Sequence, residues 1–492
     1  MISSAHLMVS ALILPLLAAV LIVLSDKKPN LREAITLVTA TLVAFIVVTL
    51  ARRVLSGEVP QLDLLEVIPG IHIAFSIEPL GMIFALVAGT LWLVTSVYSI
   101  GYMRGHHEKN QTRFYAAFAI AISSTLAAAF SANMFTLFLC YEILTISTYP
   151  LVTHAGSTEA KRSGRIYLGI LLGTSIGFQL LAILITWSTA GTLDFKQGGI
   201  LEGKLDPAYA GILYALFIFG VGKAAVMPFH KWLPAAMVAP TPVSALLHAV
   251  AVVKAGVFTV LKVTLFIFGT NFITESGASD WLVWFAAATI LLASLIAITK
   301  DNLKARLAYS TVSQLSYIVL GALVATQMSV IGASMHIAMH AFAKITLFFA
   351  AGAILVAAHK SEISDMKGLG KAMPFTFTAF TIASLSIIGL PPFGGMWSKW
   401  YLALGTVQAE QWTLLAVLMI SSLLNIFYLL PIAIRGFFSK PDTGEVYTEI
   451  KEAPLTMLLA IGVTTIMCIV LFFYPDPFYE LATQATSLQY SR

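Results

Sequence analysis

The chain has 492 residues, of which 58% are hydrophobic and only 11% are charged, and its mean hydropathy is +0.88. This composition lies far outside the range of soluble globular proteins and predicts an integral membrane protein. The net charge of +5 sits on an apolar background, which excludes a nucleic-acid-binding surface as its explanation. Both cysteines, Cys140 and Cys468, fall in apolar runs, so no disulfide framework or metal-cluster spacing is present.

Apolar runs of about 20 residues, the length that crosses a roughly 30 Å hydrocarbon layer as a helix, recur along the whole chain. We mark about 14 such runs: 8–24, 32–51, 79–101, 113–131, 133–153, 165–188, 208–229, 241–262, 281–299, 303–325, 330–358, 374–405, 411–434 and 454–474. The longest gaps, near 53–78 and 189–207, are too short for a soluble domain. Because lone strands cannot satisfy their backbone in lipid, the predicted fold class is an all-α polytopic membrane protein.

The runs group into four segments. We predict an N-terminal three-helix segment (1–112), a first five-helix repeat (113–262), a second five-helix repeat (281–434) and a C-terminal helix (454–474). The two repeats comprise spans four to eight and nine to thirteen, and they begin an odd number of spans apart. They are therefore predicted to be inverted in the membrane, an arrangement typical of transporters.

Basic residues are distributed unequally between the loops. Most of the 29 Lys and Arg residues follow odd-numbered spans, whereas Arg52, Arg53 and Lys262 are among the few on the other side. The positive-inside rule then places the odd-numbered loops in the cytoplasm and both termini outside, in a multi-pass protein of the cell inner membrane. Four lysines belong to no loop because they lie within apolar runs: Lys223, Lys254, Lys344 and Lys399.

One acid is equally out of place. Glu142 lies in the middle of TLFLCYEILTISTYPLV, whereas Glu78 and Asp301 stand at the ends of spans. A charge at the bilayer centre costs about 2.5–3.5 kcal/mol on insertion scales, so these groups must face the interior of the bundle. A single glutamate cannot neutralise four lysines, which argues against a set of purely structural ion pairs. Groups that change protonation in a partly hydrated interior suit a proton path better.

Histidines extend this set of titratable groups. His248 precedes Lys254 in the eighth span, and in MHIAMHAFAKITLFF the residues His336, His340 and Lys344 recur every four positions along one helical face. Histidines at this spacing can also share a zinc ion, but no third ligand is suggested, so no metal site is predicted. A hydrated titratable stripe is the favoured interpretation.

Two spans carry helix-breaking residues beside a lysine. In FGVGKAAVMPFHKWLP, Pro228 follows Lys223, and in IIGLPPFGGMWSKW, Pro391 and Pro392 precede Lys399. Proline kinks can serve packing alone. Broken helices at membrane depth are otherwise found where they line a cavity, and half-helix ends are where transporters build ion sites.

Five stretches carry a resemblance to a known family: YEILTISTYPLVTH, VGKAAVMPFHKWLPAAMVAPTPVSALLHAVAVVKAGV, KARLAYSTVSQLSYI, HIAMHAFAKITLFFAAG and GLPPFGGMWSKW. Over roughly residues 75–435 the chain resembles the antiporter-like subunits shared by complex I and the multisubunit Mrp cation/proton antiporters. The resemblance implies fourteen core helices with two inverted repeats. By position it implies proton transfer by Glu142, Lys223, Lys254 and Lys399, connected by His248, His336, His340 and Lys344.

Within this family the chain is most similar to the D-type subunit of the Mrp antiporters. Lys399 occupies a position where some complex I members carry glutamate, and the apolar runs end with the fourteenth. The resemblance implies a non-enzymatic, proton-translocating transporter subunit. Its expected partners are other small hydrophobic subunits, the lipid bilayer, protons and a monovalent cation, Na⁺ first; nucleic acid is not expected.

Other functions are compatible with the same set of titratable residues. The first alternative is the proton-pumping, non-redox subunit of a complex I or membrane-hydrogenase enzyme. The chain carries no flavin, haem or iron–sulfur motif, so no cofactor is expected in it. A carbon-uptake module and a purely structural subunit are further alternatives. No carboxylate cluster suits a hard cation within the spans, which favours proton handling over cation binding.

The expected mechanism is electrostatic. An ionised Glu142 close to Lys223 favours the charged lysine, and separating the two pushes a proton towards Lys254 and finally Lys399. Lys399 then exchanges its proton with one side of the membrane.

Overall fold

The computed structural model describes residues 3–441 and 449–487. Within them, twelve helices are long and apolar enough to cross a membrane, and two shorter apolar helices, Pro207–Gly220 and Pro374–Ile388, belong to interrupted spans. The prediction of an all-α polytopic membrane protein is confirmed. The division into four segments stays a prediction.

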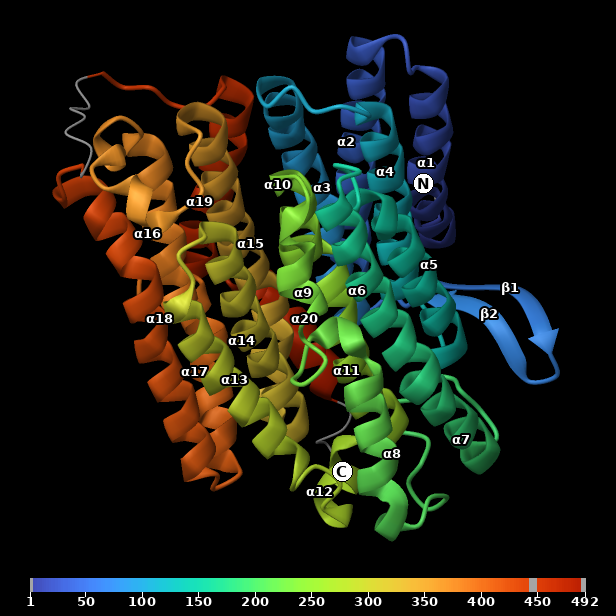
Figure 1. Cartoon of the computed structure of the whole chain (residues 1–492). Helices are drawn as coiled ribbons and strands as arrows, with labels where there is room; N and C mark the ends of the chain where they lie inside the picture. The colour runs from blue at the N-terminus through green and yellow to red at the C-terminus, as the bar shows by residue number, and fades with distance from the viewer. Residues whose placement is uncertain (1–2, 442–448, 488–492) are drawn as a thin grey trace.

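The N-terminal segment contains α1 (Ser4–Leu24), α2 (Pro29–Leu55) and α3 (Pro79–Gly105). Helix α3 starts where the Glu78 carboxylate accepts the backbone N–H groups of Leu80 and Gly81, an N-cap that satisfies two otherwise unpaired donors. Between α2 and α3 the chain forms an antiparallel hairpin, β1 (Gln61–Ile68) and β2 (Ile71–Ser76), which projects from the bundle in Figure 1. The sequence did not predict this hairpin.

The next helices run through the first predicted repeat, and π-helical turns interrupt two of its spans. Their bounds are α4 (Gln111–Ala129), α5 (Met134–Val152), α6 (Thr158–Thr174), a π turn (Ser175–Gln179), α7 (Leu180–Ala190), α8 (Pro207–Gly220), a 3₁₀ turn (Gly222–Ala224), α9 (Trp232–Ala235), a 3₁₀ turn (Ala236–Val238), α10 (Thr241–Ala245), a π turn (Leu246–Val250), α11 (Val252–Lys262), a π turn (Val263–Phe268) and α12 (Thr270–Ser276). The span that contains α10 and α11 is enclosed by protein: every residue from 239 to 270 is buried.

The remaining helices form the other flank of the bundle, from yellow to red in Figure 1. Their bounds are α13 (Leu282–Thr299), α14 (Leu303–Val324), α15 (Gln327–Ala358), two 3₁₀ turns (Ile363–Met366 and Leu369–Lys371), α16 (Pro374–Ile388), α17 (Gly395–Gln408), α18 (Trp412–Phe438), α19 (Leu455–Phe473) and α20 (Asp476–Ser487). The long α15 packs against α17, α14, α16 and α3, and thus joins the two flanks. Helix α20 lies beyond the predicted spans and is amphipathic, with Leu481, Ala482 and Ala485 among its buried residues.

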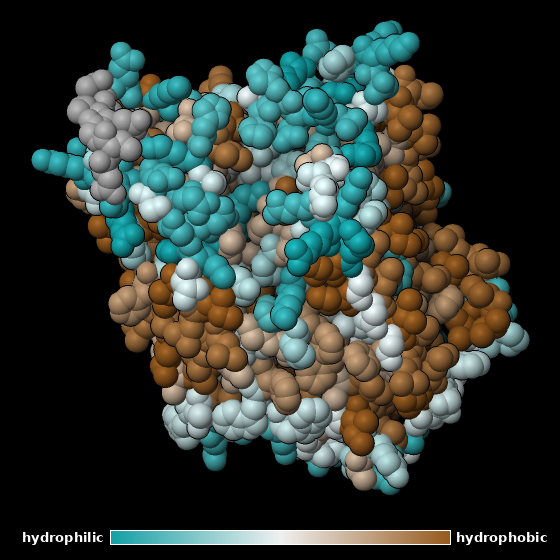
Figure 2. All heavy atoms as spheres, viewed as in Figure 1, coloured by the Kyte–Doolittle hydropathy of each residue, from teal (hydrophilic) through white to brown (hydrophobic). Residues whose placement is uncertain are grey.

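The exterior of the bundle is apolar around its middle, as a lipid-facing surface requires. Phe45, Ile146 and Phe427 are 71%, 62% and 66% exposed. Hydrophilic side chains gather at the upper end in Figure 2, where the loops after α1 and α3 lie in Figure 1. We call this end, which carries loops 25–28, 106–110, 153–157 and 359–373, the basic face.

The described ends of the chain lie together at the opposite end. The Arg53 guanidinium at the end of α2 donates to Ser4 Oγ at 2.8 Å, and Gln484 Nε2 in α20 donates to the carbonyl of Leu55 at 3.2 Å. The start of α1 and the end of α20 therefore share the face opposite to the basic face.

Candidate functional site

The first break holds a fully buried lysine. Helix α8 ends at Gly220, and Lys223 follows in the 3₁₀ turn with no exposed surface. Its Nζ donates to the carbonyl of Tyr141 at 2.8 Å and to Thr145 Oγ1 at 2.5 Å, both on α5. The turn is pressed against α11, where a Cβ added to Gly256 would stand 2.3 Å from the backbone nitrogen of Ala224. Glycine at 256 therefore permits the close approach of α11 to the break.

Glu142 is held apart from this lysine. Both of its carboxylate oxygens are buried and have no hydrogen-bond partner among the described residues. The carboxylate still acts electrostatically on Lys223. Because the ammonium contacts Tyr141 and Thr145 instead, the structure corresponds to the separated arrangement of the two charges.

A contact network joins the middle of the bundle to the second half. Lys254 Nζ on α11 lies 2.5 Å from His340 Nδ1 on α15. The rings of His340 and His336 are 5.7 Å apart, as expected one turn apart on a helix. His336 then contacts Ser398 Oγ on α17 at 2.8 Å and Gln314 Oε1 on α14 at 3.2 Å.

Two further members of the predicted path lie beside this network. Lys344 Nζ donates to Ser310 Oγ at 2.7 Å, and the hydroxyl of Tyr428 donates to the same oxygen at 3.0 Å. His248 packs its ring 4.8 Å from that of Phe348, and neither of its ring nitrogens has a hydrogen-bond partner within the described chain. The ammonium groups of Lys344 and Lys254 lie within electrostatic range of this imidazole.

The second break positions Lys399 on α17. Its Nζ donates to the carbonyl of Ile388, the last residue of α16, at 3.1 Å and to Ser422 Oγ at 3.2 Å. Helix α16 is capped by Gly389 at φ +92°, where a Cβ would stand 2.8 Å from Lys399 Cδ, so both the backbone angle and the space favour glycine. Pro391 and Pro392 lie between the two helices.

Lys399 also meets the surface. It is 9% exposed and lines an apolar groove of about 640 Å³ between α17 and α18. The structure thus brings Lys254, His340, His336 and Lys399 into one region, while Lys223 and Glu142 form a separate group on the α5 side.

Comparisons with known proteins place this arrangement in a family. A family profile described as "NADH:quinone oxidoreductase/Mrp antiporter, TM" matches residues 131–425, and one described as "NADH-Ubiquinone oxidoreductase (complex I), chain 5 N-terminus" matches residues 69–115. The chain belongs to the NADH:quinone oxidoreductase/Mrp antiporter family. Both breaks and every residue of the predicted path lie within the first matched range.

Relatives within this family come from several complexes. The chain is 33% identical over 436 residues to NADH-quinone oxidoreductase subunit N of Desulforudis audaxviator, covering 86% of this chain and 85% of the relative. It is 30% identical to NADH-quinone oxidoreductase subunit L of Campylobacter jejuni, over 93% of this chain and 74% of the relative. Hydrogenase-4 component B of Escherichia coli is 30% identical, over 80% and 61%. Other relatives are NAD(P)H-quinone oxidoreductase chain 5 or subunit 5 proteins, and the match to this chain covers only about half of their length.

Solved structures share the fold of this antiporter-family subunit. A chain in the structure of the Mrp complex from Dietzia superposes with a TM-score of 0.86 at 21% identity, covering 100% of this chain and 98% of that chain. A chain of the membrane-bound sulfane sulfur reductase, an archaeal respiratory membrane complex, gives 0.86 at 24% identity, over 98% and 97%. At these identities the likeness establishes the fold alone.

Sequence reasoning missed the polar partners of the buried bases. Ser310, Gln314 and Tyr317 recur at three- and four-residue spacing in α14 and face Lys344, His336 and Lys399, respectively. The polar residues of YSTVSQLSY could have predicted these contacts, because hydroxyl and amide groups on a buried helix face need hydrogen-bond partners. In the part of the chain that the structure describes, no group of three His, Cys, Asp or Glu residues could hold a metal ion.

One sequence assignment was wrong. Lys262, assigned to a loop, is buried at the end of α11 and pairs with Glu78 Oε1 at 2.8 Å. The span continues through a π turn as far as Phe268, so the lysine lies inside it rather than at its end. The pair ties α11 to the N-terminus of α3.

Proposed function

We propose that this chain is the proton-translocating subunit of a multisubunit monovalent cation/proton antiporter, similar to the D-type subunit of the Mrp antiporters. The observation that carries the proposal is the burial of four lysines and three histidines of the predicted path, with Glu142 as the one acid deep inside a described span. Permanent charges in such excess would be strongly destabilising in a low-dielectric interior. The cost is smaller if only one or a few of these bases carry a proton at a time. Passing a proton from one base to the next is then proton transport.

In the proposed cycle, Glu142 controls the charge on Lys223. When the carboxylate moves towards the ammonium, Coulomb attraction favours the charged lysine; when it withdraws, Tyr141 and Thr145 alone hold the ammonium and its proton is released towards Lys254. The contacts of Lys223 with Tyr141 and Thr145, and the lack of a hydrogen-bond partner for the Glu142 carboxylate in the described chain, support a withdrawn state in this cycle. This role for the two residues is our hypothesis.

The later steps follow the contact network. The proton passes from Lys254 to His340, because the lysine Nζ is in direct contact with the His340 ring. It then passes to His336, one helical turn away, and on towards Lys399. Lys399 rests on a backbone carbonyl at a helix break and reaches the molecular surface, which suits a group that exchanges its proton with one side of the membrane.

The test is transport by the assembled complex carrying Glu142→Gln. We expect proton flux, followed with a pH-sensitive dye in vesicles, to fall at least tenfold because the amide cannot alternate the charge state of Lys223. Glu159→Gln, at the exposed start of α6, is the matched control and should transport normally. Unchanged transport in an assembled Glu142→Gln complex would overturn the proposal.

A second candidate function is proton pumping as the non-redox subunit of a redox-driven membrane complex. The sequence relatives described above, which are subunits of NADH-quinone oxidoreductases and of hydrogenase-4, favour it. Gentle purification from the native membrane and mass spectrometry separate the two candidates. Small hydrophobic partners without redox subunits support the antiporter, and co-purifying flavin or iron–sulfur subunits support the alternative.

We also propose that the basic face is cytoplasmic in the cell inner membrane, so that both termini lie outside. The gathering of Lys and Arg on this face supports the assignment through the positive-inside rule. A membrane-impermeant reagent added to intact cells should label an N-terminal tag and should not label a cysteine placed at Lys109.

A further inference from the structure

The groove between α17 and α18 is apolar and contains one charged group. Its volume is about 640 Å³, and its walls include Trp400, Leu404, Met419 and Leu423. Trp400, Met419 and Leu423 are exposed, so the groove opens sideways towards the surrounding lipid. Among the described residues that line it, Lys399 alone is charged. Apolar ligand sites usually contain a few polar groups that orient the ligand, and Lys399 stands where it can do so.

The ammonium of Lys399 can accept a further partner. A lysine ammonium has three N–H donors, and the described chain provides two hydrogen-bond acceptors for them, the Ile388 carbonyl at 3.1 Å and Ser422 Oγ at 3.2 Å. Nζ also lies 4.9 Å from the centroid of the Tyr317 ring. These partners are neutral, and no ion pair between described residues includes Lys399. The third donor and the positive charge are therefore both available to an anion.

Lys399 lies near the middle of its span. It stands one turn into α17, just after the break that divides the span into α16, with 15 residues, and α17, with 14 residues. Each half is about 21–22 Å long, so the break is far from both ends of the bundle. A charged phospholipid headgroup stays at the membrane surface and does not reach this depth. An anion that meets Lys399 must therefore arrive through the hydrocarbon layer, which only its neutral, protonated form crosses readily.

From Lys399 the groove continues along α18. Its lining on this helix extends from Ile426, beside the break, to Leu415, one turn from the start of α18. At the rise of an α-helix this distance is about 16 Å. The lining residues between these two ends offer apolar contacts along the whole length. A single acyl chain that ends in a carboxylic acid therefore matches both the groove and its lysine.

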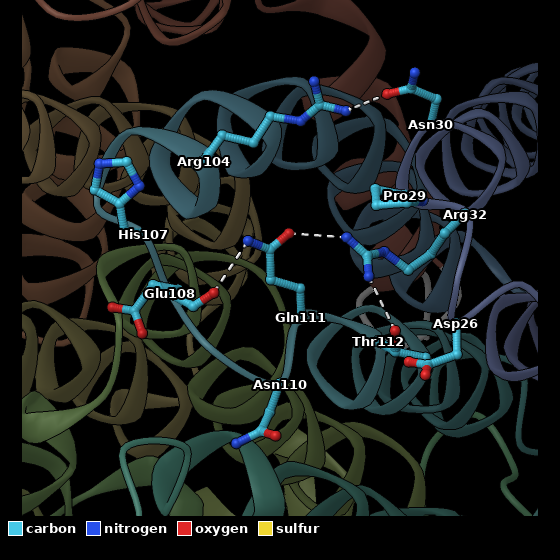
Figure 3. A pocket seen from close by; sticks show the side chains of 10 residues that line it. All are labelled: Asp26, Pro29, Asn30, Arg32, Arg104, His107, Glu108, Asn110, Gln111 and Thr112. Carbon is cyan, nitrogen blue, oxygen red and sulfur yellow. Dashed lines mark hydrogen bonds between the residues drawn. The ribbon is translucent and has the colours of Figure 1, made fainter.

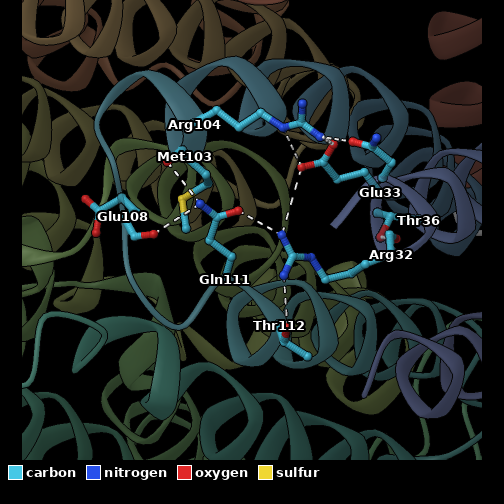
Figure 4. Close-up of polar contacts among 9 residues, drawn as sticks. Arg32, Glu33, Thr36, Met103, Arg104, Glu108, Gln111 and Thr112 are labelled. Atoms are coloured by element: carbon cyan, nitrogen blue, oxygen red, sulfur yellow. Dashed lines mark hydrogen bonds and ion pairs between the residues drawn. The ribbon is translucent and has the colours of Figure 1, made fainter. Parts of the chain in front are cut away.

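A polar hollow on the basic face is larger but offers no comparable charge. Its volume is about 800 Å³, and it lies between the α1–α2 and α3–α4 connections (Figure 3). Arg104 donates to both carboxylate oxygens of Glu33, at 3.0 and 2.5 Å. Arg32 donates to Thr112 at 2.9 Å and to Gln111 at 2.8 Å (Figure 4). Because these contacts join α2, α3 and α4, the arginines of the hollow serve packing.

A second apolar groove, between α8 and α13 beside the first break, has no charge at all. Its volume is about 420 Å³, and Phe178, Phe219, Phe229 and Trp281 are among its lining residues. None of the described residues that line it is charged. A lipophilic molecule can enter either groove, whereas an anion finds a partner only in the groove between α17 and α18. The two grooves therefore separate the effect of charge from that of apolar surface.

We propose that the groove between α17 and α18 binds a long-chain fatty acid, with its carboxylate on the Lys399 ammonium and its acyl chain along α18. The neutral acid enters from the hydrocarbon layer, and its O–H proton passes to the amine of an uncharged Lys399. The products are a carboxylate and an ammonium held as an ion pair, so no further reactant is needed. This binding site goes beyond the proposed function and does not depend on it.

Occupancy has a consequence for transport, and this consequence rests on the proposed function. A carboxylate beside Lys399 stabilises the charged form of the lysine. The acyl chain also covers the side on which Lys399 meets the surface. A bound fatty acid therefore keeps the proton on Lys399 and inhibits its exchange with one side of the membrane.

The binding test uses palmitic acid that carries a photoreactive diazirine in its chain, added to the full complex in its native membrane. Crosslinked residues are identified by mass spectrometry. We expect crosslinks at Leu404 and Leu423, and at least tenfold fewer at Phe219 and Phe229 of the uncharged groove. Unlabelled palmitate should displace the probe, whereas methyl palmitate, which has no carboxylate, should compete at least tenfold less well.

Variants of Lys399 give a second reading of the same experiment. Lys399→Met should lower crosslinking in the groove between α17 and α18 at least tenfold, and Lys399→Arg, which keeps the charge, should retain at least half of it. If Lys399→Met fails to assemble, competition by the methyl ester tests the charge in the unmodified complex.

Three results would show simple partition into an apolar surface and overturn the proposal: undiminished crosslinking in Lys399→Met, equal crosslinking of the two grooves, or equal competition by palmitate and its methyl ester. The absence of crosslinks in the groove of the unmodified complex also overturns it, and indicates that another subunit covers this face.

Proton flux in proteoliposomes tests the consequence, with the leak of protein-free vesicles subtracted. We expect palmitate, at the concentration that saturates crosslinking, to lower flux at least fivefold, and methyl palmitate to leave it within twofold of the untreated complex. Unchanged flux at saturation overturns the inhibitory role of the site. Glu142→Gln is measured alongside, because normal flux in that variant counts against the proposed function rather than against the fatty-acid site.

Discussion

The break after α8 encloses Lys223 completely, whereas the break between α16 and α17 leaves Lys399 9% exposed at the edge of an apolar groove. Lys223 contacts a carbonyl and a hydroxyl of an unbroken neighbouring helix, with Glu142 within electrostatic range. Lys399 contacts the carbonyl that its own break exposes, and no carboxylate is among its hydrogen-bond or ion-pair partners in the described chain.

The difference indicates a division of labour. A lysine that is sealed from both solvent and lipid changes its charge only when a neighbouring group moves, so Lys223 suits a switch. A lysine that reaches the surface and rests on a fixed backbone dipole suits exchange with the outside. Each of the following experiments tests whether this contrast is real.

The largest expected effect comes from replacing the two lysines by methionine. Lys223→Met should lower proton flux about 100-fold, in the range typical of a positioned proton-transfer group, and Lys399→Met only about tenfold, because Lys399 is not fully enclosed by the protein. The measurement is dye-monitored flux in vesicles with equal amounts of assembled complex. Equal losses in the two variants would remove the contrast.

Replacing the glycine beside each break should also destabilise the first break more than the second. Gly256→Val forces a Cβ to 2.3 Å from backbone of the first break, whereas Gly389→Val meets the flexible Lys399 side chain but strains a backbone at φ +92°. We expect a large loss of thermal stability for Gly256→Val and about 1–3 kcal/mol for Gly389→Val. The control is Gly173→Val, which has open space around it. Melting of the purified complex in detergent provides the readout, and a Gly256→Val complex as stable as the control would contradict the tight packing.

The smallest effects concern the hydroxyl partners. Thr145→Val removes a charge-assisted hydrogen bond from the enclosed lysine and should lower flux about fivefold, whereas Ser422→Ala should cost about twofold, since Lys399 keeps its carbonyl partner and is near the surface. Flux is measured as before. A stronger effect of Ser422→Ala than of Thr145→Val would reverse the assignment of the two roles.

Much of this architecture could be predicted from the sequence because charges and prolines within apolar runs are costly and therefore informative. The spans, the interrupted seventh and twelfth helices and the buried positions of the four lysines all follow from that rule. The roles assigned to the lysines, histidines and Glu142 stay predictions, since no comparison above tests them.

Other features carried no comparable signal. The hairpin between α2 and α3 has a β1 strand that is almost wholly exposed, so it shows no alternation of buried and exposed residues. The π turns of the sixth and eighth spans depend on packing against neighbours rather than on local composition. The separation of Glu142 from Lys223 is a tertiary arrangement: the lysine contacts Tyr141 and Thr145, whereas the carboxylate has no hydrogen-bond partner in the described chain.

The wholly buried stretch from 239 to 270 has a consequence for how the protein is made. This segment carries His248, Lys254 and Lys262, and a helix with two lysines partitions poorly into lipid on its own. Its stabilising contacts come from both sides of the sequence: Glu78 precedes it, whereas His340 follows it. The eighth span should therefore settle in the bilayer only after α15 has been synthesised, so the middle of the chain is among the last parts to reach its final environment.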